Sequence, residues 1–492
     1  MLSTVALVLV LVGACGDGGG SAPAVVSVSV EPSSVSLYVN GTESFTAMVT
    51  GVNDTSVVWD ATCGSVVGSG GTVVFTAPGS VPAPPTCVLT ATSQADASVS
   101  GSAVITIAEA PGAVIWSRAF GTSDYDWAAG VAVDGAGNVL VSGWTMGSLE
   151  ATNAGGEDAF VKKYDPDGSV VWARQFGTSG DDVAWDVAVD GSGNVLVAGW
   201  TYGSLEGASA GGSDAFVRKY DADGSVVWTR QFGTSDDDFA RGVAVDASGN
   251  VLVSGNTRGS LEGANAGNLD AFVRKYDADG SVVWTRQFGT SGLDGANGVA
   301  VDTSGNVLVA GWTRGSLEGV NAGGADAFVR KYDPDGTVVW TRQFGTSDDD
   351  FARGVAVDES GNVLVSGDTR GSLEGESAGG ADAYVRKYDP DGSVVWTRQF
   401  GTSSDDTAGA VAVDGSGNVL VSGDTQGSLE GANAGLTDAF VRKYDADGIV
   451  VWTRQVGENS NDVGPGVAAD AAGNVLAVGA IAYDAFVIKY AP

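Results

Sequence analysis

The chain contains no histidine among its 492 residues. Hydrolases of the Ser-His-Asp and Cys-His kinds, and most catalytic zinc sites, need an imidazole as a base or a ligand. These classes are therefore excluded, whereas chemistry that uses carboxylates alone, or a lysine or tyrosine base, remains open. We predict that the protein is not an enzyme.

Basic residues are scarce. The chain has 25 Lys and Arg against 60 Asp and Glu, which gives a formal net charge of −35. Binding to nucleic acid requires basic side chains that neutralise phosphates, so nucleic acid is not an expected partner. Charged residues make up only 17% of the chain and glycines number 75. This composition favours short strands joined by tight turns over helices.

Cysteine is also rare, with Cys15, Cys63 and Cys87 only. Cys15 follows an apolar run, residues 2–12, that has the length of a signal-peptide core and is too short to span a bilayer. Residues 12–15 (VGAC) resemble the lipobox of bacterial lipoproteins. The resemblance implies a signal peptide over residues 1–14 and a lipid on Cys15. An ordinary cleaved leader with an incidental cysteine is the alternative.

Residues 15–22 include GDGGGS, which cannot bury a side chain of any size and is typical of a flexible tether. Position 16 is Gly rather than Asp, which by the lipoprotein resemblance implies retention in the outer membrane. We therefore expect an exported protein, anchored at the outer membrane or cell surface, that contacts the membrane only through its lipid.

Residues 23–108 contain seven short runs rich in Val and Thr, separated by turn residues. Such runs predict a β-sandwich. The opening SVSVEPSSVSLYVNGTESFTA resembles bacterial immunoglobulin-like domains, which implies a spacer. Cys63 and Cys87 lie at the ends of different predicted strands and are expected to form a disulfide in an oxidising compartment. Residues 109–112 (EAPG) are the predicted linker to the rest of the chain.

From residue 113 to residue 492 the sequence repeats with a step of 56 residues. The repeat is marked by seven tryptophans, Trp116, Trp172, Trp228, Trp284, Trp340, Trp396 and Trp452. A repeat near this length indicates a solenoid, a propeller or another array of supersecondary units.

Each repeat predicts four strands. In the third repeat these strands are residues 242–246, 250–255, 270–277 and 281–288. The first two are joined by Asp-x-x-Gly-Asn and the last two by Asp-x-Asp-Gly. Both motifs are typical of hairpin turns in which glycine adopts a positive φ.

The ends of the array predict how it closes. It begins with an unpaired fourth strand, residues 113–120, and ends on a third strand, residues 484–490. Pairing these two segments would complete seven four-stranded blades and remove the exposed ends of an open stack. Through SGNVLVSG and DAFVRKYDPDGSVVW, residues 113–492 resemble the seven-bladed β-propeller (SBBP-type) repeat family of bacterial surface proteins. That resemblance implies an all-β fold and supplies no shared catalytic residues.

The positions at which the repeats differ are the candidate ligand-binding positions. They lie just after the second strand or just before the first strand, so all are expected on the face with the longer loops. The candidates are Trp144, Trp185, Trp200, Tyr202, Arg241, Arg258, Trp312, Arg314, Arg353 and Arg370. Aromatic and arginine side chains suit recognition of a glycan or a protein. Random drift of exposed loops is the alternative interpretation.

Two aspartates recur in every repeat on the same predicted face, represented by Asp238 and Asp270. Their carboxylates could coordinate calcium, or each could accept backbone N–H bonds and fix its repeat to the next. Repetition in all seven copies favours the structural role. We therefore expect no cofactor, with calcium as the weaker possibility.

These observations predict a non-catalytic, surface-anchored binding or scaffold lipoprotein that recognises a glycan or a protein. The alternative is a polysaccharide hydrolase or lyase that uses carboxylates at the mouth of the central channel. That alternative requires an acidic pair confined to one or two repeats, and no such pair stands out.

Overall fold

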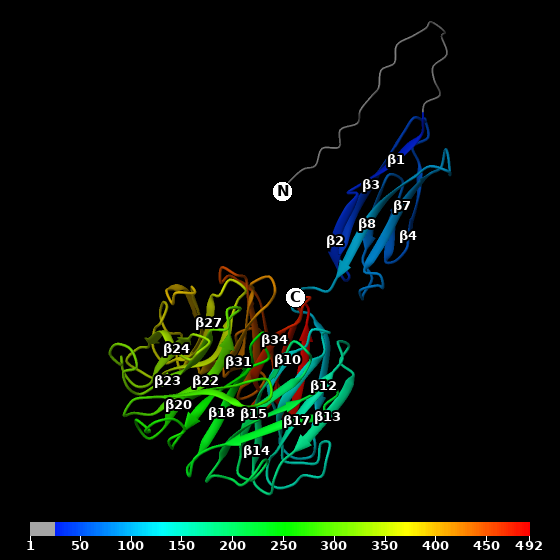
Figure 1. Ribbon diagram of the computed structural model, residues 1–492. Coiled ribbons are helices and arrows are strands. Elements are labelled where there is room, and N and C mark those ends of the chain that lie inside the picture. Colours follow the sequence, from blue (N-terminus) through cyan, green and yellow to red (C-terminus); the bar gives the residue numbers. More distant parts are fainter. Residues whose placement is uncertain (1–24) are drawn as a thin grey trace, which may run out of the picture. The chain divides into compact units, whose positions relative to one another are not determined.

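The computed structural model describes residues 25–492, which contain 36 strands and no helix. The predicted signal peptide, the lipidation site Cys15 and the tether of residues 15–22 lie outside the described residues. Over the range that is described, no helix long and apolar enough to cross a membrane is found. The chain divides into two compact units, Met1–Ala110 and Pro111–Pro492 (Figure 1).

The first unit consists of two four-stranded sheets with strand orders β1-β3-β6-β5 and β2-β8-β7-β4. The strands are β1 (Ser27–Glu31), β2 (Ser34–Tyr38), β3 (Thr42–Thr50), β4 (Val57–Ala61), β5 (Ser65–Ser69), β6 (Thr72–Thr76), β7 (Thr86–Ser93) and β8 (Ser100–Ala108). Side chains of alternating residues meet in one core that contains Phe45 and Phe75, both fully buried. The sequence predicted seven of these strands and missed β5, because its glycine-rich, mostly exposed residues lack an alternating apolar pattern.

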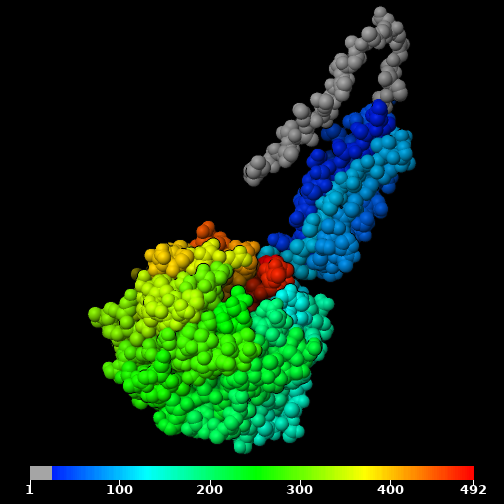
Figure 2. Space-filling model, in the orientation of Figure 1, coloured from blue at the N-terminus to red at the C-terminus, as the bar shows by residue number. Residues whose placement is uncertain are grey.

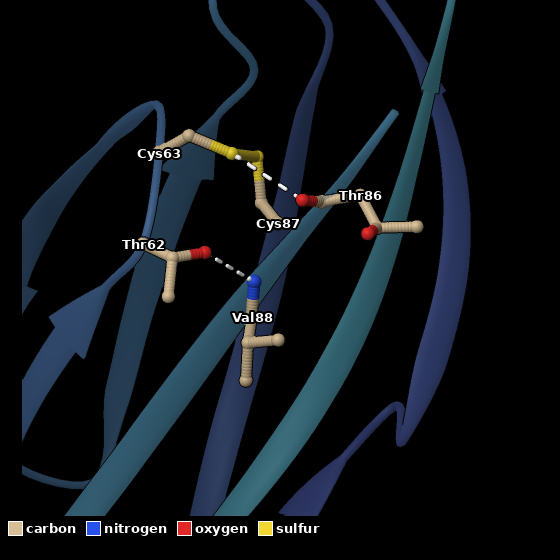
Figure 3. The surroundings of a disulfide bond; sticks show 5 residues. All are labelled: Thr62, Cys63, Thr86, Cys87 and Val88. Atoms are coloured by element: carbon tan, nitrogen blue, oxygen red, sulfur yellow. Dashed lines mark hydrogen bonds between the residues drawn. A yellow bond between two sulfur atoms is a disulfide. The ribbon is translucent and has the colours of Figure 1, made fainter. Parts of the chain in front are cut away.

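The expected disulfide between Cys63 and Cys87 is present, with a Cα–Cα distance of 5.3 Å (Figure 3). Cys87 lies on β7, and Cys63 lies in the connection that follows β4. Beside the disulfide, the Val88 amide donates a hydrogen bond of 2.8 Å to the Thr62 hydroxyl. The covalent bond and the hydrogen bond together attach the β4–β5 connection to the middle of the sheet.

The second unit consists of seven antiparallel four-stranded sheets. The first strands are β10 (Asp126–Val133), β14 (Asp182–Val189), β18 (Asp238–Val245), β22 (Asp294–Val301), β26 (Asp350–Val357), β30 (Asp406–Val413) and β34 (Val463–Ala469). The second strands are β11 (Val139–Thr145), β15 (Val195–Thr201), β19 (Val251–Thr257), β23 (Val307–Thr313), β27 (Val363–Thr369), β31 (Val419–Thr425) and β35 (Val475–Ile481).

The third and fourth strands of these sheets are equally regular. The third strands are β12 (Asp158–Tyr164), β16 (Asp214–Tyr220), β20 (Asp270–Tyr276), β24 (Asp326–Tyr332), β28 (Asp382–Tyr388), β32 (Asp438–Tyr444) and β36 (Asp484–Tyr490). The fourth strands are β13 (Val170–Phe176), β17 (Val226–Phe232), β21 (Val282–Phe288), β25 (Val338–Phe344), β29 (Val394–Phe400), β33 (Val450–Val456) and, from the start of the unit, β9 (Val114–Phe120). The sheets are numbered 1 to 7 below, and sheet 7 contains β34, β35, β36 and β9.

The first strand of each repeat begins earlier than predicted. The prediction for the third repeat was residues 242–246, whereas β18 begins at Asp238, which pairs with Thr257. A β-bulge between Ala240 and Gly242 breaks the alternation of side chains, so the alternating pattern did not predict the first half of the strand. Six of the ten candidates therefore lie within the strands, near one end of each sheet, and the other four, Tyr202, Arg258, Arg314 and Arg370, directly follow the second strand as expected.

The hairpin turns have the predicted conformation. In the first turn of sheet 3, Gly249 has a φ of +82°, and in the second turn Gly280 has a φ of +80°. The Asp246 carboxylate accepts hydrogen bonds from the amides of Ser248 and Asn250, both 2.9 Å long. The ammonium group of Lys275, on β20, pairs with the same carboxylate at 3.1 Å. These contacts hold the pKa of Asp246 below its usual value despite the opposing effect of burial.

The two ends of the second unit pair as the sequence predicts. β36 pairs with β9, with Ser117 opposite Ile488. The C-terminal residues, coloured red, lie beside the cyan residues that begin this unit (Figures 1 and 2). A core cluster joins sheet 7 to sheet 1 and includes Trp116, Phe160 and Val487. The first strand β34 also contacts β10, as each first strand contacts the first strand of the next sheet.

A repeated contact joins the fourth strand of each sheet to the second hairpin turn of the next. The Trp284 indole donates a 3.0 Å hydrogen bond to the Pro334 carbonyl, and the Arg286 Nε donates one of 2.8 Å to the Gly336 carbonyl. The Arg286 guanidinium also lies over the Trp284 ring, 5.4 Å from its centre. We call this set of contacts the Trp–Arg clamp. The same arginine–carbonyl bond occurs at Arg118, Arg174, Arg230, Arg342, Arg398 and Arg454.

We predict that Arg286→Lys lowers the free energy of unfolding by about 1–3 kcal/mol, because lysine keeps the charge but loses the planar group that reaches several acceptors. Urea denaturation measures the change. Arg314→Lys is the matched control, since Arg314 is exposed and forms a single ion pair among the described residues, with Asp349 at 3.7 Å. Equal stability of the two variants would contradict the role of the clamp.

Candidate functional site

One end of the sheets carries the candidate residues. Here the first strand begins, the second strand ends and a link leads to the third strand. In sheet 1 this link is residues 146–157, and in sheet 7 it is residues 482–483 only. We call this end the long-link face. The variable positions lie at this face on neighbouring strands. In sheet 1, for example, Trp127 on β10 pairs with Trp144 on β11.

Three indole rings form a continuous stack across sheets 1 and 2. The ring centroids of Trp127 and Trp144 lie 5.3 Å apart with an angle of 11°, and those of Trp144 and Trp185 lie 5.7 Å apart with an angle of 10°. The Arg241 guanidinium from sheet 3 covers Trp185 at 4.4 Å. Burial lowers the pKa of Arg241. The structure thus brings together three predicted residues, Trp144, Trp185 and Arg241, and adds Trp127.

Trp200 occupies the position of Trp144 in the next sheet, but it packs edge to face rather than in a stack. Its ring lies 5.6 Å from Phe239 and 5.4 Å from Tyr202, with angles near perpendicular. Tyr202 is half exposed. These residues extend the aromatic surface from sheet 2 to sheet 3.

A separate group lies on sheets 4 and 5. Trp312 packs edge to face on Phe351 at 5.7 Å. The Arg353 guanidinium lies over the same Phe351 ring, and its Nε donates a hydrogen bond of 2.5 Å to the Asp368 carboxylate. Trp312, which is half-buried, and Arg353, which is exposed, are therefore both held in place by contacts within the protein.

The remaining predicted arginines form weak contacts. Arg258, Arg314 and Arg370 are exposed. Their nearest carboxylates are those of Asp237, Asp349 and Asp405, at 3.7, 3.7 and 3.9 Å respectively. Exposed pairs at these distances contribute little to stability, so these three arginines remain available to a partner.

The recurring aspartates are engaged in structural hydrogen bonds. The buried Asp238 carboxylate accepts hydrogen bonds from the amide and hydroxyl of Thr234, at 2.5 and 3.0 Å. The Asp270 carboxylate accepts from the Ala266 amide at 2.8 Å and from the Gln287 side chain at 3.0 Å. Burial raises the pKa of Asp238, and the neighbouring Asp214 adds to the increase. Residues 25–492 contain no group of three or more Cys, Asp or Glu side chains arranged to hold a metal.

A cavity of about 380 Å³ opens between sheets 6, 7 and 1 on the long-link face. A volume of this size is within the range of small-molecule sites. Its lining includes Tyr125, Trp127, Asp405, Asp424, Gln426 and Asn461. None of the ten predicted residues lines it, although Asp424 and Gln426 belong to the same variable series. Two features of the sequence indicate this cavity. The last repeat is ten residues shorter than the others, and the residue that follows the recurring aspartate before or at the start of the first strand, Trp127 in sheet 1 and Val463 in sheet 7, varies between repeats.

Two acidic residues occur only in sheets 5 and 6 at one position of the repeat, Asp368 and Asp424. They are an acidic pair confined to two repeats, the feature that the hydrolase alternative requires. Asp368 bonds to Arg353, whereas burial raises the pKa of Asp424 to about 6. Another single acid, Asp186, lies at the bulge of β14 and accepts the Val243 amide of the next sheet at 2.9 Å. Burial raises its pKa to about 6 as well.

The geometry defines a repeat protein built from four-stranded β-sheets whose sequence varies at one end, the long-link face. Comparison with family models agrees, because six segments match the SBBP family, described as a beta-propeller repeat. The matching segments are residues 115–150, 171–206, 227–262, 283–318, 339–374 and 395–430. These segments are therefore beta-propeller repeats.

Two curated proteins are similar in sequence. "Regulatory protein FlaEY" of Caulobacter vibrioides is 28% identical over 379 residues, which cover 68% of this chain and 39% of that protein. "Uncharacterized WD repeat-containing protein L264" of Acanthamoeba polyphaga mimivirus is 24% identical over 239 residues, which cover 38% of this chain and 17% of that protein. The chain thus spans well under two thirds of the length of either relative.

Among solved structures, an apocarotenoid oxygenase of Synechocystis is 10% identical, with a TM-score of 0.39 over 73% of this chain and 88% of the other.

We predict that Trp144→Leu abolishes the exciton signal of stacked indoles in the circular dichroism spectrum, because Trp144 is the middle ring of the stack. Trp312→Leu removes an indole that packs on Phe351 and is the matched control. The control is expected to keep the signal. Retention of the full signal in Trp144→Leu would show that the three rings are not stacked in solution.

Proposed function

We propose that the protein is a non-catalytic, surface-anchored binding or scaffold lipoprotein that recognises a glycan or an envelope or extracellular protein. Recognition takes place at the long-link face. The supporting observation is the concentration of aromatic and arginine side chains there, led by the Trp127–Trp144–Trp185 stack. Aromatic faces bind sugar rings and anchor protein interfaces at a low entropic cost.

The proposed architecture is a closed seven-bladed β-propeller that follows an immunoglobulin-like spacer. Three observations support closure: the pairing of β9 with β36, the contact between β34 and β10, and the Trp–Arg clamp from Arg454 to Gly112, at 2.8 Å. The two sheets of the first unit, packed on one core, support the spacer.

The proposed location is the outer membrane or cell surface, with export by the signal peptide and a lipid on Cys15 as the only membrane contact. The disulfide between Cys63 and Cys87 supports an oxidising compartment. The proposal includes no nucleic-acid partner and no cofactor. Calcium at Asp238 or Asp270 stays a prediction; one oxygen of each carboxylate already accepts hydrogen bonds, and the other has no hydrogen-bond partner among the described residues.

The second candidate function is a polysaccharide hydrolase or lyase. It is favoured by the pair Asp368 and Asp424, which occupy the same position in neighbouring sheets, because burial raises the pKa of Asp424 to about 6 and a carboxyl group with such a pKa can act as a general acid. Release of products from polysaccharides by the purified protein, and its loss in Asp424→Asn, would support this function. The absence of both would leave binding as the better account.

The binding function predicts that the purified exported part captures a member of a panel of glycans and envelope proteins. The double variant Trp200→Ala and Trp312→Ala is expected to weaken capture at least about tenfold. Val227→Ser is the matched control, because Val227 is exposed on a fourth strand away from the long-link face. Failure of the whole panel, or equal capture by all variants, would contradict the proposal.

A further inference from the structure

The cavity between sheets 6, 7 and 1 exists because the last repeat is ten residues shorter than the others. In sheet 7 the link between β35 and β36 is Ala482-Tyr483, where the other sheets have twelve residues. Both residues of this link have positive φ, +49° and +82°, which is uncommon for residues other than glycine. A tight two-residue turn therefore replaces the long link and leaves the space open.

Small side chains in sheet 7 deepen the same opening. At three variable positions this sheet has Val463, Pro465 and Ala480, where some of the other sheets carry Trp, Phe or Arg. Val463 lines the cavity floor. Trp127 of sheet 1 and two carboxylates of sheet 6 line the same opening.

The aromatic wall is preorganised. Trp144 covers one face of the Trp127 ring, so the opposite face is left to the cavity that this ring lines. Tyr125, beside it, packs edge to face on Tyr483 of the short turn, with centroids 4.8 Å apart. A ring fixed on one side offers its other side as a rigid platform with little loss of side-chain entropy on binding.

The lining of the cavity is also anionic. It carries Asp405 and Asp424, and the described residues that line the cavity include no Lys or Arg. Asp424 forms no ion pair within 4 Å among residues 25–492, whereas Asp405 lies 3.9 Å from the exposed Arg370. Gln426 and Asn461 add amide groups that can donate to or accept from hydroxyls. An aromatic platform opposite a free carboxylate suits a cation carried on a ring or an apolar frame.

We propose that this cavity binds an amino sugar with a free amine, such as a glucosamine residue of a glycan, with its ammonium at Asp424 and its ring face on Trp127. The inference rests on the proposed glycan-binding function and specifies its site and ligand class. The carboxylate supplies charge selectivity, the indole packs on the C–H face of the sugar, and the amides orient its hydroxyl groups.

The charges around Asp424 set the pH dependence of this site. Burial is the main cause that raises its pKa to about 6; Arg353 opposes the increase, and Asp368 and Asp406 add to it. Asp424 is therefore ionised at neutral pH and becomes protonated as the pH falls through about 6. The bound ammonium stabilises the ionised form, so affinity for the amino sugar decreases below that pH.

The test uses calorimetric titration of the full exported protein with the β-1,4-linked glucosamine tetrasaccharide at neutral pH. The matched probes are the N-acetylglucosamine and glucose tetrasaccharides, which keep the sugar ring but lack the ammonium. Asp424→Asn keeps the shape of the side chain and is expected to weaken binding of the glucosamine probe at least about tenfold. Asp279→Asn is the control, because Asp279 is an exposed carboxylate in a hairpin turn at the opposite end of its sheet.

The proposal expects preference for the glucosamine probe, loss of that preference in Asp424→Asn and weaker binding one pH unit below the pKa of Asp424. Equal binding of all three probes, unchanged by Asp424→Asn, would overturn the amino-sugar assignment and leave glycan binding in place. No binding of any probe would also overturn it, and the wider panel with the Trp200 and Trp312 variants would then decide whether the proposed function survives.

Discussion

The Trp–Arg clamp is the contact on which the rest of the second unit depends. A four-stranded sheet has two open faces, and each is buried only when the neighbouring sheet is held at the right distance. The clamp provides this spacing, because a tryptophan and an arginine two residues apart bind carbonyls of the next hairpin turn, as Trp284 and Arg286 do at Pro334 and Gly336. Where the two ends of the second unit meet, the equivalent arginine is Arg454. Its Nε donates a hydrogen bond to the carbonyl of Gly112, which precedes β9, instead of to a carbonyl within a continuous hairpin turn. The Trp452 indole N–H has no hydrogen-bond partner among residues 25–492, which distinguishes this junction of the two ends from the other contacts between sheets.

Regularity of this kind is readable from sequence. The 56-residue step, the Asp-x-x-Gly-Asn and Asp-x-Asp-Gly turns and the surplus strand at residues 113–120 predicted the four-strand repeat and the β9–β36 pairing, because each follows from local turn chemistry and alternation. The disulfide was predictable for a different reason: with Cys15 assigned to the leader, only Cys63 and Cys87 were left to pair.

The long-link face was less predictable. The bulge at Ala240–Gly242 interrupts the alternating pattern, so the first strands appeared to start four residues late. The variable residues then seemed to be exposed loop residues, although Trp144 and Trp185 stack on each other. The cavity depends on residues from sheets 6, 7 and 1 that meet only when the array bends round, and no local pattern could bring Trp127 and Asp424 together. The ten candidate positions lie on the long-link face, as predicted from the sequence, but none of them lines the cavity.

Sheet 7 contains both the β9–β36 pairing, which joins the two ends of the second unit, and the short turn beside the cavity. The most direct test is amide hydrogen exchange along β9 in the intact protein. The account predicts that residues 114–120 exchange as slowly as the equivalent strand β13 of sheet 1, because both are paired with a third strand. Fast exchange of residues 114–120 beside a protected β13 would show that the two ends do not pair, and would contradict the account.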